Sequence, residues 1–342
     1  MTYRAVALFS GGLDSTLAIL AVLRQGISVK AIKFQTPFDC GVSKDPASVA
    51  ERFGFCIEVR NLGEKFLEVV KDPEHGYGKN MNPCIDCRIM MLREARAFLD
   101  SVEADFIITG EVLGQRPMSQ RKDMLYHIDK KAGVTNRVVR PLSAKLLKVT
   151  DAEAGGIVSR EMLYGFSGRS RKPQMDLAEE FGLTDYPSPA GGCLLTEPNY
   201  ACRLKDLMAF APSPSLRDID LLRIGRHFRY SPLCKIIVGR DRTENETIES
   251  LATGEDVLLK VDGYGSPLTL VSGEITQEAL KVAASLCARY SDARNNVSVD
   301  VNDVNDPGFM LKVSVAGDEL IDVLRIEKKG TGRTSKASPV SP

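Results

Sequence analysis

The 342-residue sequence lacks several features that would place it in a broad functional class. Lysine plus arginine and aspartate plus glutamate number 45 each, so no global charge attracts a polyanion and any nucleic-acid surface must be local. No apolar run approaches the length of a membrane span, and the amino terminus lacks a charged leader followed by an apolar core and a cleavage site. We therefore expect a cytoplasmic protein without a membrane partner.

A disulfide framework is also not expected. Cytosolic thiols stay reduced, so eight cysteines in such a protein favour metal or sulfur chemistry. Cys56 and Cys287 lie in apolar stretches and are expected in the core. The cysteines are Cys40, Cys56, Cys84, Cys87, Cys193, Cys202, Cys234 and Cys287.

One glycine turn organises the amino-terminal half. The apolar run 5–9 predicts a buried parallel strand, and a helical pattern starts at Thr16. A turn between them directs backbone N–H groups and the positive end of a helix dipole at one point, which predicts a phosphate ligand. Because no Gly-Lys-Ser/Thr ending follows, this is not a Walker loop, and an ordinary glycine turn is the alternative. The residues of the turn are Ser10, Gly11, Gly12, Leu13, Asp14 and Ser15.

The segments that follow predict an α/β fold. Strand patterns at 28–34, 56–59, 105–109 and 138–139 alternate with helical ones, including 47–53. Such alternation implies a doubly wound parallel sheet with helices on both faces and ligands outside the carboxyl ends of the strands.

Cys84 and Cys87 form a single C-x-x-C at the start of a long helical pattern. Pro83 marks the helix start, where the dipole is expected to lower thiol pKa values and favour thiolates. The pair is open to three interpretations: half of a zinc site, a redox pair, or two ligands of an iron–sulfur cluster. No second C-x-x-C exists to favour zinc. Cys193, after two glycines in the loop 186–196, is the third thiol expected in the cleft; Cys202, which begins a helical pattern, is its rival.

The turn at residues 10–15 resembles the S-G-G-x-D-S signature of the ATP pyrophosphatases, the PP-loop superfamily. The resemblance implies that ATP is bound and split between its α and β phosphates to adenylate a second substrate. It also implies that Phe34 frames the adenine. Mg2+ is expected between the phosphates, with Asp14 as one contact and Asp39 as a weaker one.

Residues 110–120 indicate a more specific resemblance within this superfamily. The G-E-x-L-G-Q stretch followed by Ser-Gln is similar to the tRNA 4-thiouridine synthases, which implies that Gly110 and Gln115 lie beside the nucleotide. A polar loop that caps the next helix is the alternative. Those synthases carry a THUMP domain ahead of the loop, so here a carboxyl-terminal domain is expected to hold the tRNA.

Two basic regions follow. The loop 166–172, Phe-Ser-Gly-Arg-Ser-Arg-Lys, is either an RNA phosphate contact or a solvated surface loop. The stretch 238–245, with Asp241 in place of the usual asparagine, resembles the RNA-binding domain of the NFACT family. The resemblance implies phosphate contacts from four arginines and base stacking by Tyr264. The alternative is a small α+β domain with exposed arginines. The arginines are Arg226, Arg229, Arg240 and Arg242.

The predicted division follows from these matches and from the Pro- and Ser-rich stretch 211–216. We expect a PP-loop domain at 1–165, a connecting segment at 166–215 that carries the third cysteine, and a smaller α+β NFACT-type domain at 216–328. A disordered tail is expected at 329–342. The smaller domain is predicted to contain strands at 221–226, 235–238, 257–261 and 268–271, a hairpin of 297–304 with 309–315, and a further strand at 321–327.

Together these features predict an ATP-dependent tRNA thiouridylase. ATP would adenylate the carbonyl oxygen of a tRNA uridine, and sulfur would replace it. Either Cys84, Cys87 and Cys193 bind a [4Fe–4S] cluster with one open iron, or one of them carries a persulfide that another resolves. The sulfur donor would be sulfide or a cysteine desulfurase persulfide. Two alternatives are an ATP-dependent amidating ligase and an RNA-binding protein whose first domain senses ATP.

Overall fold

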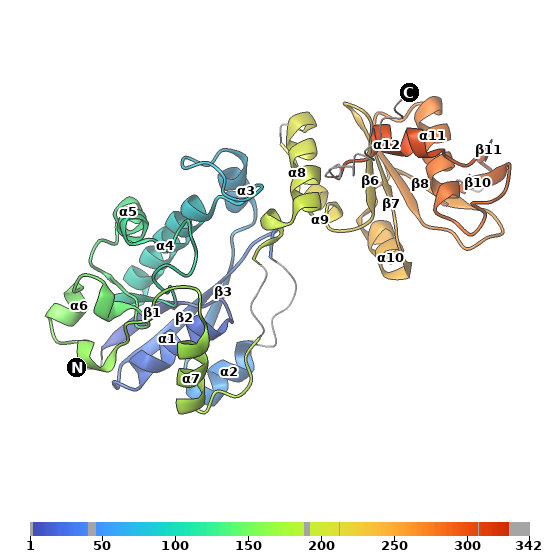
Figure 1. Ribbon diagram of the computed structural model, residues 1–342. Coiled ribbons are helices and arrows are strands. Elements are labelled where there is room, and N and C mark those ends of the chain that lie inside the picture. Colours follow the sequence, from blue (N-terminus) through green and yellow to red (C-terminus); the bar gives the residue numbers. More distant parts are fainter. Residues whose placement is uncertain (1–2, 40–45, 188–191, 212, 307, 328–342) are drawn as a thin grey trace, which may run out of the picture. The chain divides into compact units, whose positions relative to one another are not determined.

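The computed structural model describes residues 3–39, 46–187, 192–211, 213–306 and 308–327. The chain divides into two compact units, Met1–Thr196 and Glu197–Pro342 (Figure 1). The tail predicted at 329–342 lies outside the described residues. Among the described residues, no helix combines the length and apolar character needed to cross a bilayer.

The first unit contains a parallel sheet in the order β3-β2-β1-β4-β5. The strands β2 and β3 lie on one side of β1, and β4 and β5 lie on the other. The direction of the connections therefore reverses between the neighbouring strands β1 and β4. This reversal point at the carboxyl ends of the strands is where α/β sheets bind ligands. The strands are β1 (Arg4–Leu8), β2 (Ser28–Gln35), β3 (Cys56–Asn61), β4 (Phe106–Thr109) and β5 (Val138–Val139).

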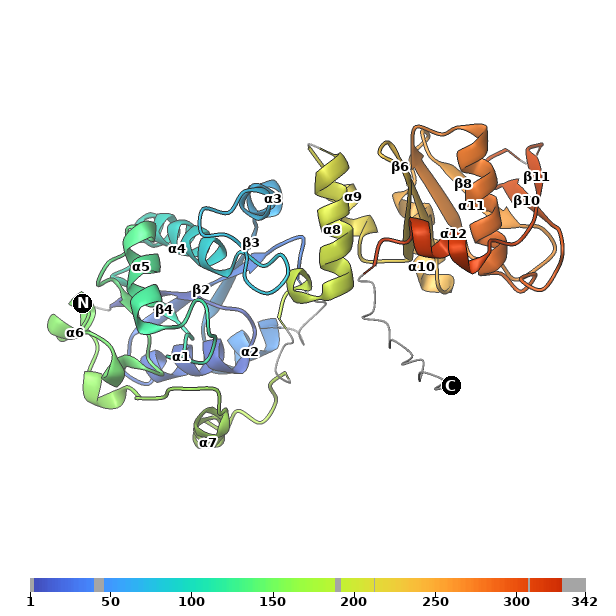
Figure 2. The same ribbon diagram turned by 45° about the horizontal axis from the view of Figure 1, so that its top comes forward.

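Helices cover both faces of this sheet, as Figure 2 shows for α1 and α4. One face packs against α1 (Leu13–Leu23), α2 (Pro46–Phe53) and α7 (Lys172–Glu180), and the other packs against α4 (Cys84–Ser101) and α5 (Lys122–Ala132). The doubly wound parallel fold predicted from the sequence is therefore confirmed. Shorter elements complete the unit: α3 (Gly63–Lys71), α6 (Asp151–Ala154) and the 3-10 turns η1 (Ala144–Leu146), η2 (Arg160–Met162) and η3 (Leu194–Thr196).

The second, smaller unit is the predicted α+β domain. Its antiparallel sheet has the order β11-β10-β8-β9-β7-β6, with α11 against one face and α9 and α10 against the other. The strands are β6 (Arg226–Ser231), β7 (Cys234–Val238), β8 (Val257–Val261), β9 (Thr269–Gly273), β10 (Val299–Asp303) and β11 (Met310–Val313). The helices are α8 (Pro198–Phe210), α9 (Leu216–Leu221), α10 (Arg242–Leu251), α11 (Gln277–Arg289) and α12 (Asp318–Leu324).

Three local predictions were wrong. The segment 221–226 is not a strand, because Ser215 and Asp218 form a capping box that starts α9. The segment 321–327 is not a closing strand, because most of it belongs to α12. Cys56 is exposed rather than in the core, because β3 is the edge strand of its sheet.

The division into units also differs from the predicted boundary at 211–216. The predicted connector, 166–215, is shared between the two units, since α7 packs in the first and α8 belongs to the second. Side chains of α8 account for this: Arg203 donates to the carbonyl of Leu222 at 3.0 Å, and Asp206 accepts from Arg229.

Candidate functional site

The predicted phosphate loop lies between β1 and α1. Gly11 adopts a φ of 77°, a region that favours glycine, and Gly12 is the N-cap of α1 without a side-chain cap. The hydroxyl of Ser15 donates to the carbonyl of Gly12 at 2.9 Å and lies 3.1 Å from the hydroxyl of Ser10, so side chains brace the loop from within. The first-turn N–H groups of α1 have no helical acceptor, which leaves them for an anion.

Asp14 has one engaged and one unengaged carboxylate oxygen. Gln115 donates to Oδ2 of Asp14 at 3.0 Å, whereas Oδ1 is buried and has no partner among the described residues. A buried orphan carboxylate oxygen is an oxygen ligand of the kind that Mg2+ prefers. The residues here therefore fit the predicted ion. Gln115 holds Asp14, a contact that the sequence alone did not suggest.

Gly110 lets the end of β4 pack directly on this loop. A Cβ at this position would lie 2.5 Å from the amide nitrogen of Ser15 and 2.6 Å from the carbonyl carbon of Asp14. Only glycine tolerates so close an approach of two backbones. Gly110 is thus a packing residue for the loop, whatever it contributes to a ligand.

A buried ion network lies directly behind Gly110. Arg140, which is 3% exposed, donates to Glu111 at 2.9 Å and makes two bonds to Asp129 at 2.8 and 2.9 Å. Arg88 of α4 approaches Glu111 at 3.7 Å. We call these four residues the Arg140 network.

Ion pairing and burial act in opposite directions on the pKa values of the two carboxylates in this network. Burial alone would raise the pKa of Glu111, but the charges of Arg140 and Arg88 outweigh it and hold that pKa below its usual value. Burial raises the pKa of Asp129 despite its bonds to Arg140. Sequence analysis missed this network, because its members are spread from 88 to 140 and no local pattern pairs them.

Cys84 and Cys87 lie in the first turn of α4, as predicted. Because α4 precedes β4 and runs against the strands, its amino terminus lies at the same sheet edge as the phosphate loop. Arg88, the next residue after Cys87, reaches the Arg140 network beside Gly110. A continuous set of contacts therefore links the paired cysteines to the loop.

The segment that contains Cys193 also lies near the start of α4. Around it, the amide of Leu194 donates to the carbonyl of Phe38 at 3.0 Å, and the amide of Met81 donates to the carbonyl of Leu195 at 3.1 Å. Asn80 adds a side-chain bond to the carbonyl of Thr196 at 2.7 Å. The segment with Cys193 thus runs beside the residues that lead into α4. Residues 188–191 of the predicted loop lie outside the described residues.

The expected low thiol pKa is wrong for Cys87. The pKa of its thiol is raised to about 12, chiefly by burial and also by Cys84, Cys193 and Asp39, while Arg88 opposes the rise. Burial of the thiol outweighs the helix dipole. Because Cys84 and Cys193 both raise the pKa of Cys87, both lie near enough to it to act electrostatically. The sulfur atoms of the three cysteines do not all lie within 4.8 Å of one another, so they do not enclose a single ion, but thiols are the soft ligands that iron–sulfur clusters take.

The remaining cysteines of the described residues lie elsewhere in the fold. Cys56 is on the edge strand β3, and Cys202 is on α8 of the second unit. Cys234 and Cys287 are buried in the core of the second unit. Cys40 lies outside the described residues.

Phe34 is half-buried near the end of β2 and packs against the α4 side of the sheet. Its contact with an adenine stays a prediction. Asp39, after the same strand, accepts from the amide and hydroxyl of Thr36 at 2.9 and 2.7 Å. The basic loop 166–172 joins this edge as well, since the amide of Gly168 donates to the carbonyl of Leu113 at 2.7 Å. Arg169 there is exposed.

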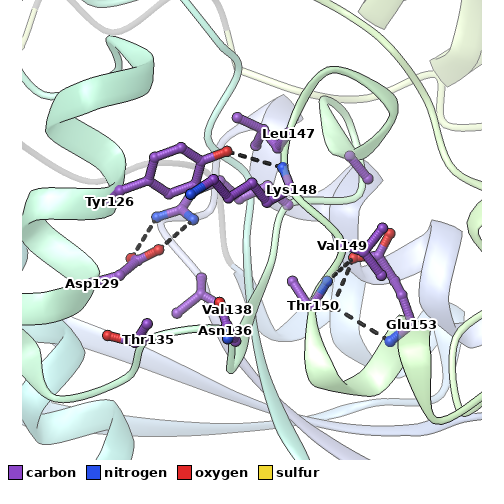
Figure 3. A pocket seen from close by; sticks show the side chains of 12 residues that line it. Tyr126, Asp129, Thr135, Asn136, Val138, Leu147, Lys148, Val149, Thr150 and Glu153 are labelled. Carbon is purple, nitrogen blue, oxygen red and sulfur yellow. Dashed lines mark hydrogen bonds and ion pairs between the residues drawn. The ribbon is translucent and has the colours of Figure 1, made fainter.

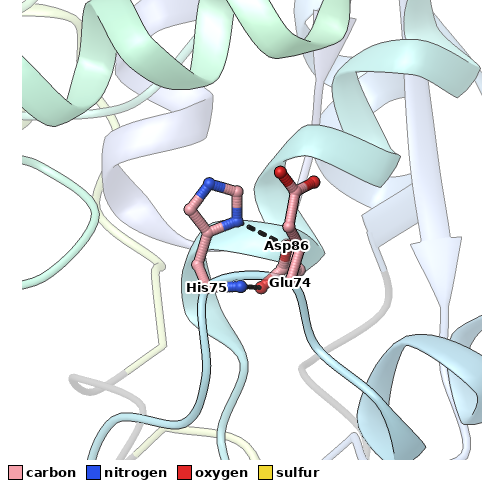
Figure 4. A group of neighbouring side chains, drawn as sticks. All are labelled: Glu74, His75 and Asp86. Carbon is pink, nitrogen blue, oxygen red and sulfur yellow. Dashed lines mark hydrogen bonds and ion pairs between the residues drawn. The ribbon is translucent and has the colours of Figure 1, made fainter.

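A hydrogen-bonded chain of Asp86, His75 and His127 was also missed by sequence analysis. Asp86 stands between the two cysteines of the C-x-x-C and lies 2.8 Å from Nδ1 of His75 (Figure 4). The Nε2 atoms of His75 and His127 are 2.8 Å apart. Glu74, His75 and Asp86 could hold a metal ion, but Lys131 already pairs with Glu74 and both ring nitrogens of His75 are engaged. The chain fixes the loop before α4.

A hollow of about 110 Å3 borders the Arg140 network, because Asp129 and Arg140 are among its lining residues (Figure 3). Tyr126 and Lys148 line it, with the amide of Lys148 donating to the Tyr126 hydroxyl at 2.9 Å. None of the site residues predicted from the sequence is among its lining residues.

The arginines predicted for the second unit have intramolecular partners. Arg226 donates to the carbonyl of Gly239 at 3.1 Å, Arg240 to that of Gly225 at 2.8 Å, and Arg229 pairs with Asp206. Arg242 is exposed and pairs with Glu246 at 2.8 Å. Tyr264 is exposed. Their contacts with RNA stay a prediction.

Comparisons with known families match both units. Residues 1–146 match the family described as thiamine biosynthesis protein (ThiI), and residues 225–322 match the NFACT protein RNA binding domain. A tRNA-specific 2-thiouridylase, MnmA, of Pelotomaculum thermopropionicum is 28% identical over 324 residues, covering 83% of this chain and 78% of that protein.

A tRNA sulfurtransferase of Pseudomonas syringae pv. syringae is 30% identical over 144 residues, or 41% of this chain, which spans 29% of that protein. Among solved structures, a 4-thiouridine synthetase–RNA complex with bound ATP is 23% identical, with a TM-score of 0.35 and 54% of each chain covered.

Proposed function

We propose that this chain, which joins a ThiI-family domain at residues 1–146 to an NFACT RNA-binding domain at residues 225–322, is an ATP-dependent tRNA sulfurtransferase. One observation supports the proposal: Cys84 and Cys193 act electrostatically on Cys87, which lies in the first turn of α4 at the sheet edge where Gly110 packs on the phosphate loop. The relatives named tRNA sulfurtransferase and tRNA-specific 2-thiouridylase support the same reaction class. An amidating ligase would leave both the thiols and the RNA-binding domain without a role.

The reaction has two steps. The carbonyl oxygen of a tRNA uridine attacks the α-phosphorus of ATP, and pyrophosphate leaves. A sulfur nucleophile, from sulfide or a cysteine desulfurase persulfide, then attacks the activated carbon, and AMP leaves with the former carbonyl oxygen. With reduced thiols and a tRNA substrate, the cytoplasm is the proposed compartment.

The residues divide between these steps. Backbone N–H groups from residues 11–15 bind the pyrophosphate portion of ATP, and Asp14, held by Gln115, is positioned to bind Mg2+ through its free oxygen. Bound Mg2+ would neutralise phosphate charge. Cys84, Cys87 and Cys193 would hold a [4Fe–4S] cluster, which supplies an open iron for sulfide. If no cluster is bound, one of these thiols carries the sulfur as a persulfide and another resolves it.

The proposal is tested by product release. Wild-type protein with ATP and unmodified tRNA should release pyrophosphate, and sulfide should then release AMP and yield a thiolated nucleoside detectable by mass spectrometry of digested tRNA. Release of ADP and phosphate, or AMP release that ignores tRNA, would contradict the proposal.

The packing of Gly110 gives a sharper prediction. Gly110→Ala should raise the KM for ATP about tenfold, because the added methyl group displaces the backbone of Asp14 and Ser15 that holds the phosphates. Steady-state AMP release measures this. Gly254→Ala is the matched control, since nothing lies within 4 Å of a Cβ there. Equal KM values for the two variants would show that the loop tolerates displacement.

A further inference from the structure

A row of polar side chains crosses one end of the sheet in the second unit. Lys235 of β7 pairs in register with Arg229 of β6 on one side and with Ser272 of β9 on the other. The residues that alternate with Lys235, including Cys234 and Ile236, point into the core beneath α11. Lys235 therefore lies on the opposite face, toward α8 and α9.

A pocket of about 180 Å3 opens at this row. Lys235, Arg229 and Ser272 line it together with Phe210 and Leu233. Phe210 is 42% exposed and Leu233 is 61% exposed, so the rim is apolar and accessible. Buried apolar side chains and the carboxylate of Asp218 also line the pocket beside Lys235. Phe210 and the other α8–α9 residues of the lining precede the segment 225–322 that matches the RNA-binding family.

Lys235 is the unusual group in this pocket. Arg229 is neutralised by Asp206, with which it makes two bonds, but no hydrogen bond or ion pair engages the Lys235 ammonium among the described residues. The pKa of Lys235 is lowered to about 8, chiefly by burial and also by Arg229 and Arg203, against the opposing charges of Asp206 and Asp218. A largely buried ammonium without a partner is costly to keep charged, and an entering anion would remove that cost.

The charges around the pocket are mixed, since Asp218 lines it and Asp206 pairs with Arg229, but several cations lie near Lys235. Residues 197–327 contain more acidic than basic side chains, yet Arg203, Arg240 and Lys235 are close enough to act together on the buried His227, whose pKa they and burial lower. Arg226 also feels the charge of Arg240. A local group of cations within an acidic unit favours the binding of an anion at that group.

We propose that this pocket binds a backbone phosphate of the tRNA, with the Lys235 ammonium contacting the phosphate and the apolar rim at Phe210 and Leu233 contacting the adjoining nucleoside. The inference rests on the proposed function, and it adds a phosphate site to the RNA-binding unit. An exposed aromatic ring beside a cation suits RNA, because bases stack on such rings while phosphates pair with the charge.

Full-length protein and unmodified tRNA test this by fluorescence anisotropy. Lys235→Met keeps the apolar stem and removes the charge, and it should weaken binding about tenfold at 0.1 M salt and reduce the slope of log Kd against log salt by about one ion. Lys235→Arg should retain most of the affinity. Lys260→Met, on the exposed side of β8, is the matched control and should bind as wild type.

The pH dependence gives a second readout. Lys235 is charged below a pKa of about 8, so wild-type affinity should fall as the pH rises from 7 to 9, whereas the affinity of Lys235→Met should change less. Lys235→Met with wild-type affinity and salt slope would overturn the inference. So would inorganic phosphate binding that depends on Lys235 without any effect on tRNA, which would identify a free-anion site.

The outcomes separate this inference from the proposed function. If Lys235→Met binds tRNA normally but the wild-type protein thiolates tRNA, only the phosphate pocket is wrong. If the wild-type protein binds tRNA through Lys235 but releases no AMP, the sulfurtransferase proposal is wrong and the pocket stands. An absence of tRNA binding by the wild type overturns both.

Discussion

Cys87→Ser should abolish tRNA thiolation, by about a thousandfold or more, while tRNA-dependent release of pyrophosphate continues. Cys84 and Cys193 both act electrostatically on Cys87, so the change removes the thiol with which both of the others interact. A serine hydroxyl is a hard oxygen donor and cannot replace a soft thiolate toward iron or carry sulfur. The measurement is mass spectrometry of nucleosides from tRNA treated with each variant.

The control for this prediction is another cysteine of the same chain. Cys56→Ser alters a thiol on the exposed edge strand β3, and Cys202→Ser alters one on α8; both should leave thiolation within about twofold of wild type, as surface changes usually do. If Cys87→Ser also stopped pyrophosphate release, the thiols would be needed for the adenylation step and the two-step scheme would fail.

The metal content decides between the two sulfur routes. Protein purified without oxygen should be brown and contain iron and acid-labile sulfide, and Cys87→Ser should lose both. A colourless protein that holds only zinc would reject the cluster. A persulfide on Cys84 or Cys193, found by mass spectrometry of that colourless protein, would support the alternative route.

Arg140→Met should lower the free energy of unfolding of the first unit by about 3–5 kcal/mol, because it leaves the carboxylates of Glu111 and Asp129 buried without their main partner. The sequence contains no tryptophan, so urea unfolding is followed by far-UV circular dichroism. Hydrogen exchange at β4 and β5 shows which unit is affected.

An exposed ion pair supplies the control for Arg140. Arg121 pairs with Asp123 at 2.9 Å on the surface, and Arg121→Met should cost about 0–1 kcal/mol. The triple change Arg140→Met, Glu111→Leu and Asp129→Leu should recover much of the lost stability, since it removes the unpaired charges as well. If Arg140→Met were as stable as Arg121→Met, water would have to reach the network and solvate both carboxylates.

Much of the architecture follows from local patterns. The apolar run at 5–9 became β1, the glycine turn after it leads into α1, and Pro83 precedes the helix that begins with Cys84. These features depend on residues within a few positions of each other, so periodicity, glycine and proline suffice to predict them. The hairpin of β10 and β11 was confirmed for the same reason.

Errors arose where a short segment had two compatible structures. The apolar residues of 221–226 and 321–327 are few, and their period does not separate a strand from a helix. Caps and burial decided instead: Ser215 with Asp218 starts α9, and Gly317 precedes α12. Cys56 was misplaced because a strand pattern does not say whether the strand is at the centre or the edge of its sheet.

The sequence by itself determined the phosphate loop, the cysteine pair at a helix start and the alternation that forces a parallel sheet. Only the tertiary structure decided that Cys193 is near enough to Cys87 to act on it electrostatically, and that Arg140 pairs with Glu111 and Asp129. It also decided that Lys235 lines a pocket without a hydrogen bond or ion pair to any described residue. Local conformation depends on neighbouring residues along the chain. Contacts between distant residues depend on which faces the packed elements bring together, and no single segment contains that information.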